Sequence, residues 1–447
     1  MSRSPGLHPL TPFSRRLFAG GGALAAAAVG SRTRARQASP AVASPAADHG
    51  HDEHEHGAAM FLAVADPVAE TVAVYTLPGH ALVNTLTGVV ANAHAGFLPL
   101  ASGELLFIDD ANRQLVGLEV HGDHLHTHMA DLPGTAFSHL AVDSDHAHWA
   151  AVGTDDAATP IVLVDLETWE TMPVELPESG EVGLMLNHDL LFHRNDVSNQ
   201  VEAYWLSDLV DGVVKPVSTV PIGPFGHGES ITMDGSTLYT ATDEGIEAIA
   251  WDGEALTFLT AYPWATSERE GGRGYFQRLS FDGTRVVSYT ADRSAPETAW
   301  ETWGNDALLI DTRSGEVNRF ELGPGYVYRF GLAAHLALFT RIGGDGDEAI
   351  VVDLATGSIT TRIPLDPMST GPVPGRSIWE ANQYRAVTVL PDGSTGFVTQ
   401  GGDGLVHVLD LGSGTVVDTF TTPTPLDGGG YLAVFGTPET ATDLIAR

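Results

Sequence analysis

Short apolar runs that end in tight turns recur through most of the chain, and this recurrence limits the fold more than any other feature. One type of run ends in Asp and a turn, as in residues 349–357 (AIVVDLATG) and 406–414 (VHVLDLGSG). A second type passes through Asp-Gly into another run, as in residues 280–287 (SFDGTRVV). Because Asp accepts turn amides and Gly supplies a positive φ, both types predict β-strands joined by hairpins.

The second type of run returns with the period of a β-propeller. Its copies lie in steps of about 40 to 56 residues, starting near His94, His139, Leu184, His227, Gln277, Arg329 and Arg385. Seven such units fill residues 94–429, and the runs at 431–435 and 61–86 can combine into an eighth blade that closes the ring. The sequence therefore predicts an all-β chain, with a β-propeller over residues 60–447. It has eight blades, or seven if one blade boundary is misplaced.

The residues before the propeller have the features of an export signal. Arg15 and Arg16 precede a modestly apolar run at residues 19–30, which is too short to span a bilayer as an anchor. This arrangement predicts a Tat-type signal peptide over residues 1–38, although a chance pair of arginines is the alternative. We expect the mature protein in the periplasm or another extracytoplasmic space, with no direct membrane insertion.

Residues 39–59 are predicted to be a disordered linker that carries a metal-binding tail. An Ala/Ser/Pro-rich start is followed by residues 48–57 (DHGHDEHEHG), which cannot form a packed core. Neutral imidazoles beside carboxylates are ligands for Zn²⁺, Ni²⁺ and Cu²⁺, and a flexible chain can wrap several around one ion. A solvated acidic segment is the simpler interpretation. The histidines of this predicted capture tail are His49, His51, His54 and His56.

Composition excludes several classes of function. There are 22 Lys and Arg against 57 Asp and Glu, and the formal net charge of −35 opposes nucleic-acid binding. The absence of cysteine removes disulfides, thiolate nucleophiles and thiolate metal ligands. The 19 histidines are therefore the main clue to function.

Several histidines fall where a propeller would bring them together. The start of each blade's innermost strand faces the central channel, so equivalent positions of different blades meet around one axis. Three imidazoles with a carboxylate or a water make a tetrahedral zinc site. We expect His139, His188 and His227 as ligands, completed by Glu229 or a water, with His94 as a further candidate.

Other residues of the inner strands are given structural roles. Arg278, Arg329 and Arg385 occupy comparable positions in later blades, where they can pair with carboxylates or hold an anion. His335 and His407 lie inside strand runs and are interpreted as hydrogen-bonded structural residues.

A second cluster of histidines lies in residues 120–128 (VHGDHLHTH). His124, His126 and His128 alternate, so on a strand they share one face at steps of roughly 6.5 to 7 Å. Together with His121 they suit a surface platform that shares a metal with another segment. An exposed polar strand without a metal is the alternative.

This combination of features resembles the AztD family of periplasmic zinc metallochaperones. The resemblance covers nearly the whole mature chain and rests on the export signal and on residues 48–57, 121–124, 138–139, 227–229 and 404–410. It implies that a monomeric, non-enzymatic chain captures zinc and delivers it to the solute-binding protein of a zinc ABC importer. The chain departs from the family pattern at residues 223–227 (GPFGH), where the family holds a cysteine.

Two other classes of function stay open. One is a propeller enzyme, such as a lactonase or a quinoprotein dehydrogenase, although the sequence shows no Ser/His/Asp arrangement and no paired-carboxylate site. The other is a non-catalytic interaction scaffold in which the histidines are incidental. Metal analysis of the purified protein, with and without the tail, separates these possibilities from the chaperone.

Overall fold

The apolar runs form β-strands, and the strands form a β-propeller of eight blades, as the period predicts. The protein is described here by a computed structural model. The predicted signal peptide, the four histidines of the capture tail and His188 lie outside the described residues. The description covers residues 59–438 except 135, 143–147, 155–160, 178–179, 181, 188, 233, 266–271, 275 and 382–384.

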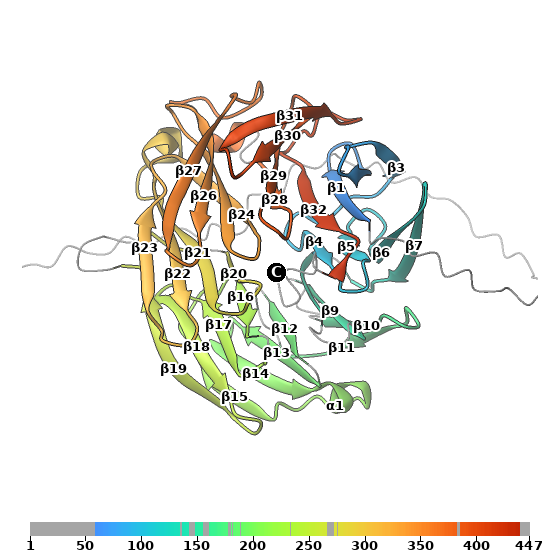
Figure 1. Ribbon diagram of the computed structural model, residues 1–447. Helices are drawn as coiled ribbons and strands as arrows, with labels where there is room; N and C mark the ends of the chain where they lie inside the picture. Colours follow the sequence, from blue (N-terminus) through green and yellow to red (C-terminus); the bar gives the residue numbers. More distant parts are fainter. Residues whose placement is uncertain are drawn as a thin grey trace, which may run out of the picture. The chain divides into compact units, whose positions relative to one another are not determined.

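Each blade is a four-stranded antiparallel sheet, and the blades are arranged around one axis (Figure 1). From the innermost strand outward, the first four blades are β32 (Tyr431–Phe435), β1 (Met60–Asp66), β2 (Thr71–Leu77) and β3 (Leu82–Thr87); β4 (Phe97–Pro99), β5 (Leu105–Asp109), β6 (Gln114–His121) and β7 (His124–Asp131); β8 (Phe137–Val142), β9 (Trp149–Thr154), β10 (Ile161–Asp165) and β11 (Thr171–Val174); β12 (Gly183–Asn187), β13 (Leu190–Asn195), β14 (Gln200–Trp205) and β15 (Ser218–Pro221).

The second half of the ring repeats this plan. Its blades are β16 (Glu229–Ile231), β17 (Thr237–Ala241), β18 (Gly245–Trp251) and β19 (Leu256–Pro263); β20 (Gln277–Leu279), β21 (Arg285–Asp292), β22 (Gly304–Asp311) and β23 (Val317–Glu321); β24 (Tyr326–Leu332), β25 (Leu336–Ile342), β26 (Asp347–Asp353) and β27 (Ser358–Leu365); β28 (Val387–Val389), β29 (Thr395–Gln400), β30 (Leu405–Asp410) and β31 (Thr415–Thr421).

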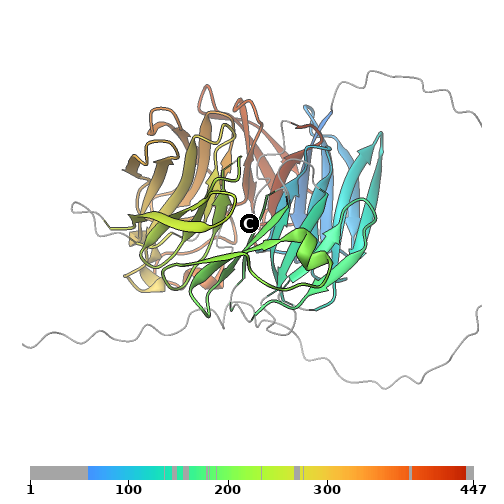
Figure 2. The ribbon, with the colours of Figure 1, turned by 90° about the horizontal axis from the view of Figure 1, so that it is seen from below.

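The last described strand closes the ring by joining the first blade. β32 runs antiparallel to β1, with Phe61 opposite Phe435 and Ala65 opposite Tyr431. The red β32 and the blue β1 therefore lie side by side in both views (Figures 1 and 2). This confirms that residues 431–435 and the run after residue 61 make the eighth blade.

The apolar core lies between neighbouring blades. Side chains of β1 alternate between two such layers: Ala63 and Ala65 pack toward the β4–β7 blade, whereas Leu62 and Val64 pack toward the β28–β31 blade. A strand covered on both faces needs apolar residues at every position. This is why the inner strands read as continuous apolar runs rather than as alternating ones.

The Asp turns have the geometry that the sequence predicts. The Oδ1 atom of Asp311 accepts hydrogen bonds from the amides of Arg313 (3.0 Å) and Ser314 (2.7 Å). Gly315 follows with a φ of 70°, a value that favours glycine. In the Asp-Gly hairpins, the Oδ1 atom of Asp282 accepts from the amide of Thr284.

Three short helices among the described residues interrupt this plan, and the repeat gave no indication of them. α1 (Leu206–Val210) follows β14 and buries Leu206 and Leu209. The 3-10 helices η2 (Glu297–Thr302) and η3 (Ile378–Glu380) contact each other. Among the described residues no helix has the length and apolar character that crossing a membrane requires.

Candidate functional site

Three histidines from three blades meet at one cavity in the centre of the propeller. His94 lies in the loop before β4, His139 lies on β8, and His227 lies two residues before β16. The ring centroids of His94 and His139 are 4.8 Å apart, and those of His94 and His227 are 5.4 Å apart. The other residues that line the cavity are Gly228, Glu229, Phe276, Gln277, Tyr289, Tyr328 and Arg329.

The loop that carries His94 is held by the side chain of Asn92. Its Oδ1 atom accepts hydrogen bonds from the amides of His94 (2.9 Å) and Ala95 (2.7 Å). Its Nδ2 group donates to the carboxylate of Asp110 and to the carbonyl oxygen of Phe137 (2.8 Å). Phe137 stands two residues before His139 on β8. Asn92 therefore ties together the two chain segments that carry His94 and His139.

His139 lies beside a buried carboxylate whose position is fixed by an arginine. The Nδ1 atom of His139 is 4.0 Å from Oε2 of Glu229, and both side chains are almost fully buried. The Nε atom of Arg194 donates to the Oε1 atom of Glu229. One oxygen of Glu229 is therefore held by Arg194, while the other faces the imidazole of His139.

Two glycines leave room for this ion pair. A Cβ atom on Gly183 would lie 2.3 Å from Oε1 of Glu229, and one on Gly226 would lie 2.4 Å from Cδ of Arg194. Both distances are too short for any side chain at these positions. The glycines are thus required by the close approach of Arg194 and Glu229, not by a turn.

His227 is kept neutral by its surroundings. Burial in the cavity lowers the pKa of His227 to about 3, with further contributions from the positive charges of Arg194 and Arg273. A neutral imidazole is the form that ligates a metal. At neutral pH, therefore, no proton has to leave His227 before it can act as a ligand.

The arginines expected at the inner strands reach different partners. Arg329 lines the histidine cavity, and its guanidinium donates to the carbonyl oxygen of Ala93, next to His94. Arg385 is fully buried and donates to Oδ2 of Asp347 at 2.9 and 2.7 Å, so it does pair with a carboxylate. Arg278 lies over the ring of Phe276, 4.7 Å from its centroid.

The structure thus brings together His139, His227 and Glu229 of the predicted set and His94, the further candidate. His188, the remaining predicted ligand, lies outside the described residues. Sequence reasoning missed Asn92 and Arg194. The sequence could have indicated Arg194, because it is a charged residue within the apolar run of β13. Nothing in the sequence marked Asn92, because its loop does not recur in the other blades.

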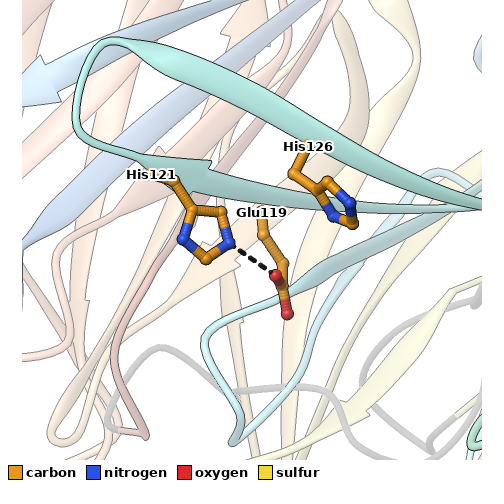
Figure 3. Close-up of side chains that lie close together, drawn as sticks. All are labelled: Glu119, His121 and His126. Atoms are coloured by element: carbon orange, nitrogen blue, oxygen red, sulfur yellow. Dashed lines mark hydrogen bonds and ion pairs between the residues drawn. The ribbon is translucent and has the colours of Figure 1, made fainter. Parts of the chain in front are cut away.

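A second group of candidate ligands lies on the β6–β7 hairpin, in the outer half of its blade. Glu119, His121 and His126 place their ligand atoms within 4.8 Å of one another (Figure 3). The repeat of histidines predicted His121 and His126, and Glu119 was missed. The sequence could have indicated Glu119 by its position two residues before His121, because residues two apart on a strand place their side chains on one face.

The other two histidines of the predicted platform have different contacts. His124 is exposed and lies 3.1 Å from the carboxylate of Asp123. His128 lies 3.4 Å from Oε1 of Glu104, and its ring contacts Trp169 of the next blade.

Comparison of the sequence with protein-family models and with curated proteins finds no match. Similar structures are known. The structure of apo AztD from Citrobacter koseri has a TM-score of 0.62 at 13% identity, covering 85% of this chain and 99% of that chain. A crystal structure of Citrobacter koseri AztD gives a TM-score of 0.61 at 14% identity, with the same coverage of both chains. The dihydro-heme d1 dehydrogenase NirN gives a TM-score of 0.59 at 16% identity, covering 85% of this chain and 76% of NirN. At these identities the comparison establishes an AztD-like propeller fold for this chain.

Proposed function

We propose that this protein is an exported zinc-binding metallochaperone whose cargo site is the central cavity. The observation that carries the proposal is the meeting of His94, His139 and His227 beside Glu229 in one cavity. His94 and His227 are more than 130 positions apart in the sequence, and the circular arrangement of the blades brings them to one cavity. The AztD-like fold and the sequence resemblance to AztD metallochaperones support the same function.

The donor set fits Zn²⁺. Zinc takes imidazole nitrogens and carboxylate oxygens in four-coordinate sites, and three imidazoles are a common set when an exchangeable ligand completes the shell. His94, His139 and His227 supply these imidazoles, and His227 is already neutral. Since Arg194 holds one oxygen of Glu229, we assign Glu229 the role of orienting His139 rather than of a strong ligand.

Delivery completes the proposed function. In this scheme the tail at residues 48–57 captures zinc, the cavity stores it, and the solute-binding protein of a zinc ABC importer receives it. Each transfer is an exchange of ligands, so no nucleotide is needed. We also propose that the chain is not an enzyme, which distinguishes it from NirN, a dehydrogenase of similar fold.

Metal analysis of purified variants tests the cargo site. The His139→Asn/His227→Asn double variant should lose one bound zinc per chain, measured by mass spectrometry after dialysis, while its circular dichroism stays that of the wild type. Glu229→Gln should weaken zinc binding about 10- to 100-fold without abolishing it, as expected for an orienting partner. His335→Asn is the matched control, because His335 is exposed in the β24–β25 turn and not inside a strand, as its sequence context had predicted.

The result against the proposal is an unchanged zinc content in the double variant. A heme titration addresses the alternative of a heme-processing enzyme. We expect no shift of the heme absorption bands when the protein is added.

A further inference from the structure

We propose that the β6–β7 hairpin holds a second, independent site for a divalent transition-metal cation, with Glu119, His121 and His126 as ligands. Nε2 of His121 lies 2.9 Å from Oε2 of Glu119, and the rings of His121 and His126 are 5.9 Å apart at 90° (Figure 3). The ligand atoms of all three residues already lie within 4.8 Å of one another. An ion placed among them would need only side-chain rotations to be bound.

The register of the hairpin fixes this arrangement. Glu119 is directly opposite His126, and His121 is directly opposite His124 at the turn. Side chains two residues apart on a strand share a face, and directly opposed residues of an antiparallel pair share it too. Gly122, with a φ of 66°, makes the tight turn between the strands. The ligands therefore sit on a paired backbone rather than on a loop.

A second carboxylate, that of Glu104, lies next to His128 of the same hairpin. The rings of His126 and His128 are 4.6 Å apart, and Nδ1 of His128 lies 3.4 Å from the buried carboxylate of Glu104. Gly117 makes this possible, because a Cβ atom there would lie 2.0 Å from Oε1 of Glu104 and 2.5 Å from the ring of Trp169. Glu104 and Glu119 together give the hairpin face the negative charge that attracts a cation.

The donor atoms define the class of cation. Two imidazoles and one carboxylate suit Zn²⁺, Co²⁺, Ni²⁺ or Cu²⁺, whereas Mg²⁺ and Ca²⁺ prefer oxygen ligands alone. Binding replaces the hydrogen bond between Glu119 and His121 by a bond from each of them to the ion. Three ligands leave one position of a tetrahedral set to water or to an incoming group.

Exposure makes this site suitable for exchange rather than storage. The side chain of His121 is 66% exposed and that of Glu119 is 33% exposed, whereas His139 and Glu229 in the central cavity are almost fully buried. A histidine of a partner protein can therefore reach the open position of the hairpin site. The site depends on the hairpin alone, so it can bind a cation whether or not the central cavity does.

Co²⁺ and Zn²⁺ binding to the full chain tests the hairpin site. The Glu119→Gln/His126→Asn double variant should bind one equivalent less of either metal than the wild type, in equilibrium dialysis and in the visible absorption of bound Co²⁺. His124→Asn is the matched control, because His124 lies on the same hairpin and contacts Asp123 instead. These positions are exposed or half-buried on a hairpin, so the variants should fold, which circular dichroism checks.

The same two changes are also made in the His139→Asn/His227→Asn background. The His139→Asn/His227→Asn protein should still bind one equivalent at the hairpin site, and adding Glu119→Gln/His126→Asn should remove it. Failure of the central site and failure of the hairpin site therefore give different numbers of bound metal ions. Equal binding by the wild type and the Glu119→Gln/His126→Asn variant would overturn the proposal. An equal loss in His124→Asn would overturn the assigned ligands.

Discussion

Asn92 shows how much one uncharged side chain contributes to a site that it does not line. It satisfies two amides of the His94 loop and links that loop to β8 through the carbonyl oxygen of Phe137. Buried amide groups that lose their partners are costly, because neither water nor protein replaces the lost hydrogen bonds. The position of His94 therefore depends on a residue that no metal-ligand motif contains.

We expect Asn92→Ala to lower the free energy of unfolding by about 1–3 kcal/mol and to weaken zinc binding at the central cavity. Denaturant unfolding and zinc competition assays measure the two effects. Asn112→Ala is the control, since its side chain also donates to a backbone carbonyl, that of Gly88 at 2.9 Å, but at the surface. If both variants weaken zinc binding equally, Asn92 has no special role in placing His94.

His407 illustrates the opposite case, a histidine with a structural role. It is buried, its Nδ1 atom lies 2.9 Å from Oγ1 of Thr419, and its Nε2 atom contacts Oε1 of Gln400. Burial lowers its pKa below the ordinary value of 6.5, and the positive charge of Arg385 lowers it further. The unfolded chain therefore takes up a proton at a pH where the folded chain does not. The stabilising contribution of neutral His407 is therefore complete above pH 6.5, the ordinary pKa of histidine, and is lost as the pH falls below that value.

We expect the stability advantage of the wild type over His407→Gln to be constant above about pH 7 and to shrink as the pH falls below 6.5, by at most about 1.4 kcal/mol per pH unit. Urea unfolding at a series of pH values measures it. His335→Gln, at an exposed histidine, is the control for a histidine-to-glutamine change that leaves the contacts of His407 intact. A constant difference between His407→Gln and the wild type down to pH 5 would contradict the pKa shift.

At the scale of elements, the strands and hairpins could be predicted because each carries its own local signal. The Asp turns, the Asp-Gly hairpins and the apolar runs covered on both faces are all visible in the sequence. The helices α1, η2 and η3 could not be predicted, since they are short insertions held by tertiary packing of residues such as Leu209, Trp300 and Ile378. The central histidines could be placed near the axis by periodicity. Their ring contacts depend on loops such as that of Asn92, which have no repeat.

The closing strand β32 offers a test at this scale. Its five residues are all buried, in contact with β1 and with the blades on both sides. Each large apolar side chain contributes about 1.5–3 kcal/mol when buried, and their sum approaches the whole stability of a typical domain, about 5–15 kcal/mol. A chain that ends at Gly430 should therefore lose its cooperative thermal transition. An intact transition without β32 would show that ring closure is dispensable.

At the scale of the whole molecule, the proposed sites differ in rigidity. The inner strands hold the central ligands in a packed ring, the hairpin holds its ligands at the surface, and the tail is predicted to be flexible. A preorganised site binds more tightly because less ordering entropy is lost on binding, whereas a flexible or exposed site exchanges its ion faster. The net charge of −35 attracts cations to every one of them. Zinc should therefore move from the tail to the centre down a gradient of affinity.

This order of events predicts a kinetic role for the tail without a role in final affinity. Deleting residues 48–57 should slow the loading of the central site at limiting zinc, while the zinc affinity of that site stays nearly unchanged. Stopped-flow mixing with a fluorescent zinc chelator measures the rate, and competition at equilibrium measures the affinity.

A second variant replaces only His49, His51, His54 and His56 by serine, so that the carboxylates and the length of the tail are kept. Slowing in both variants assigns capture to the imidazoles. Slowing in the deletion variant alone assigns capture to the negative charge of the tail. High salt should then slow zinc loading of the wild type, because it screens that charge. Equal rates in all three proteins would show that the tail plays no part in loading.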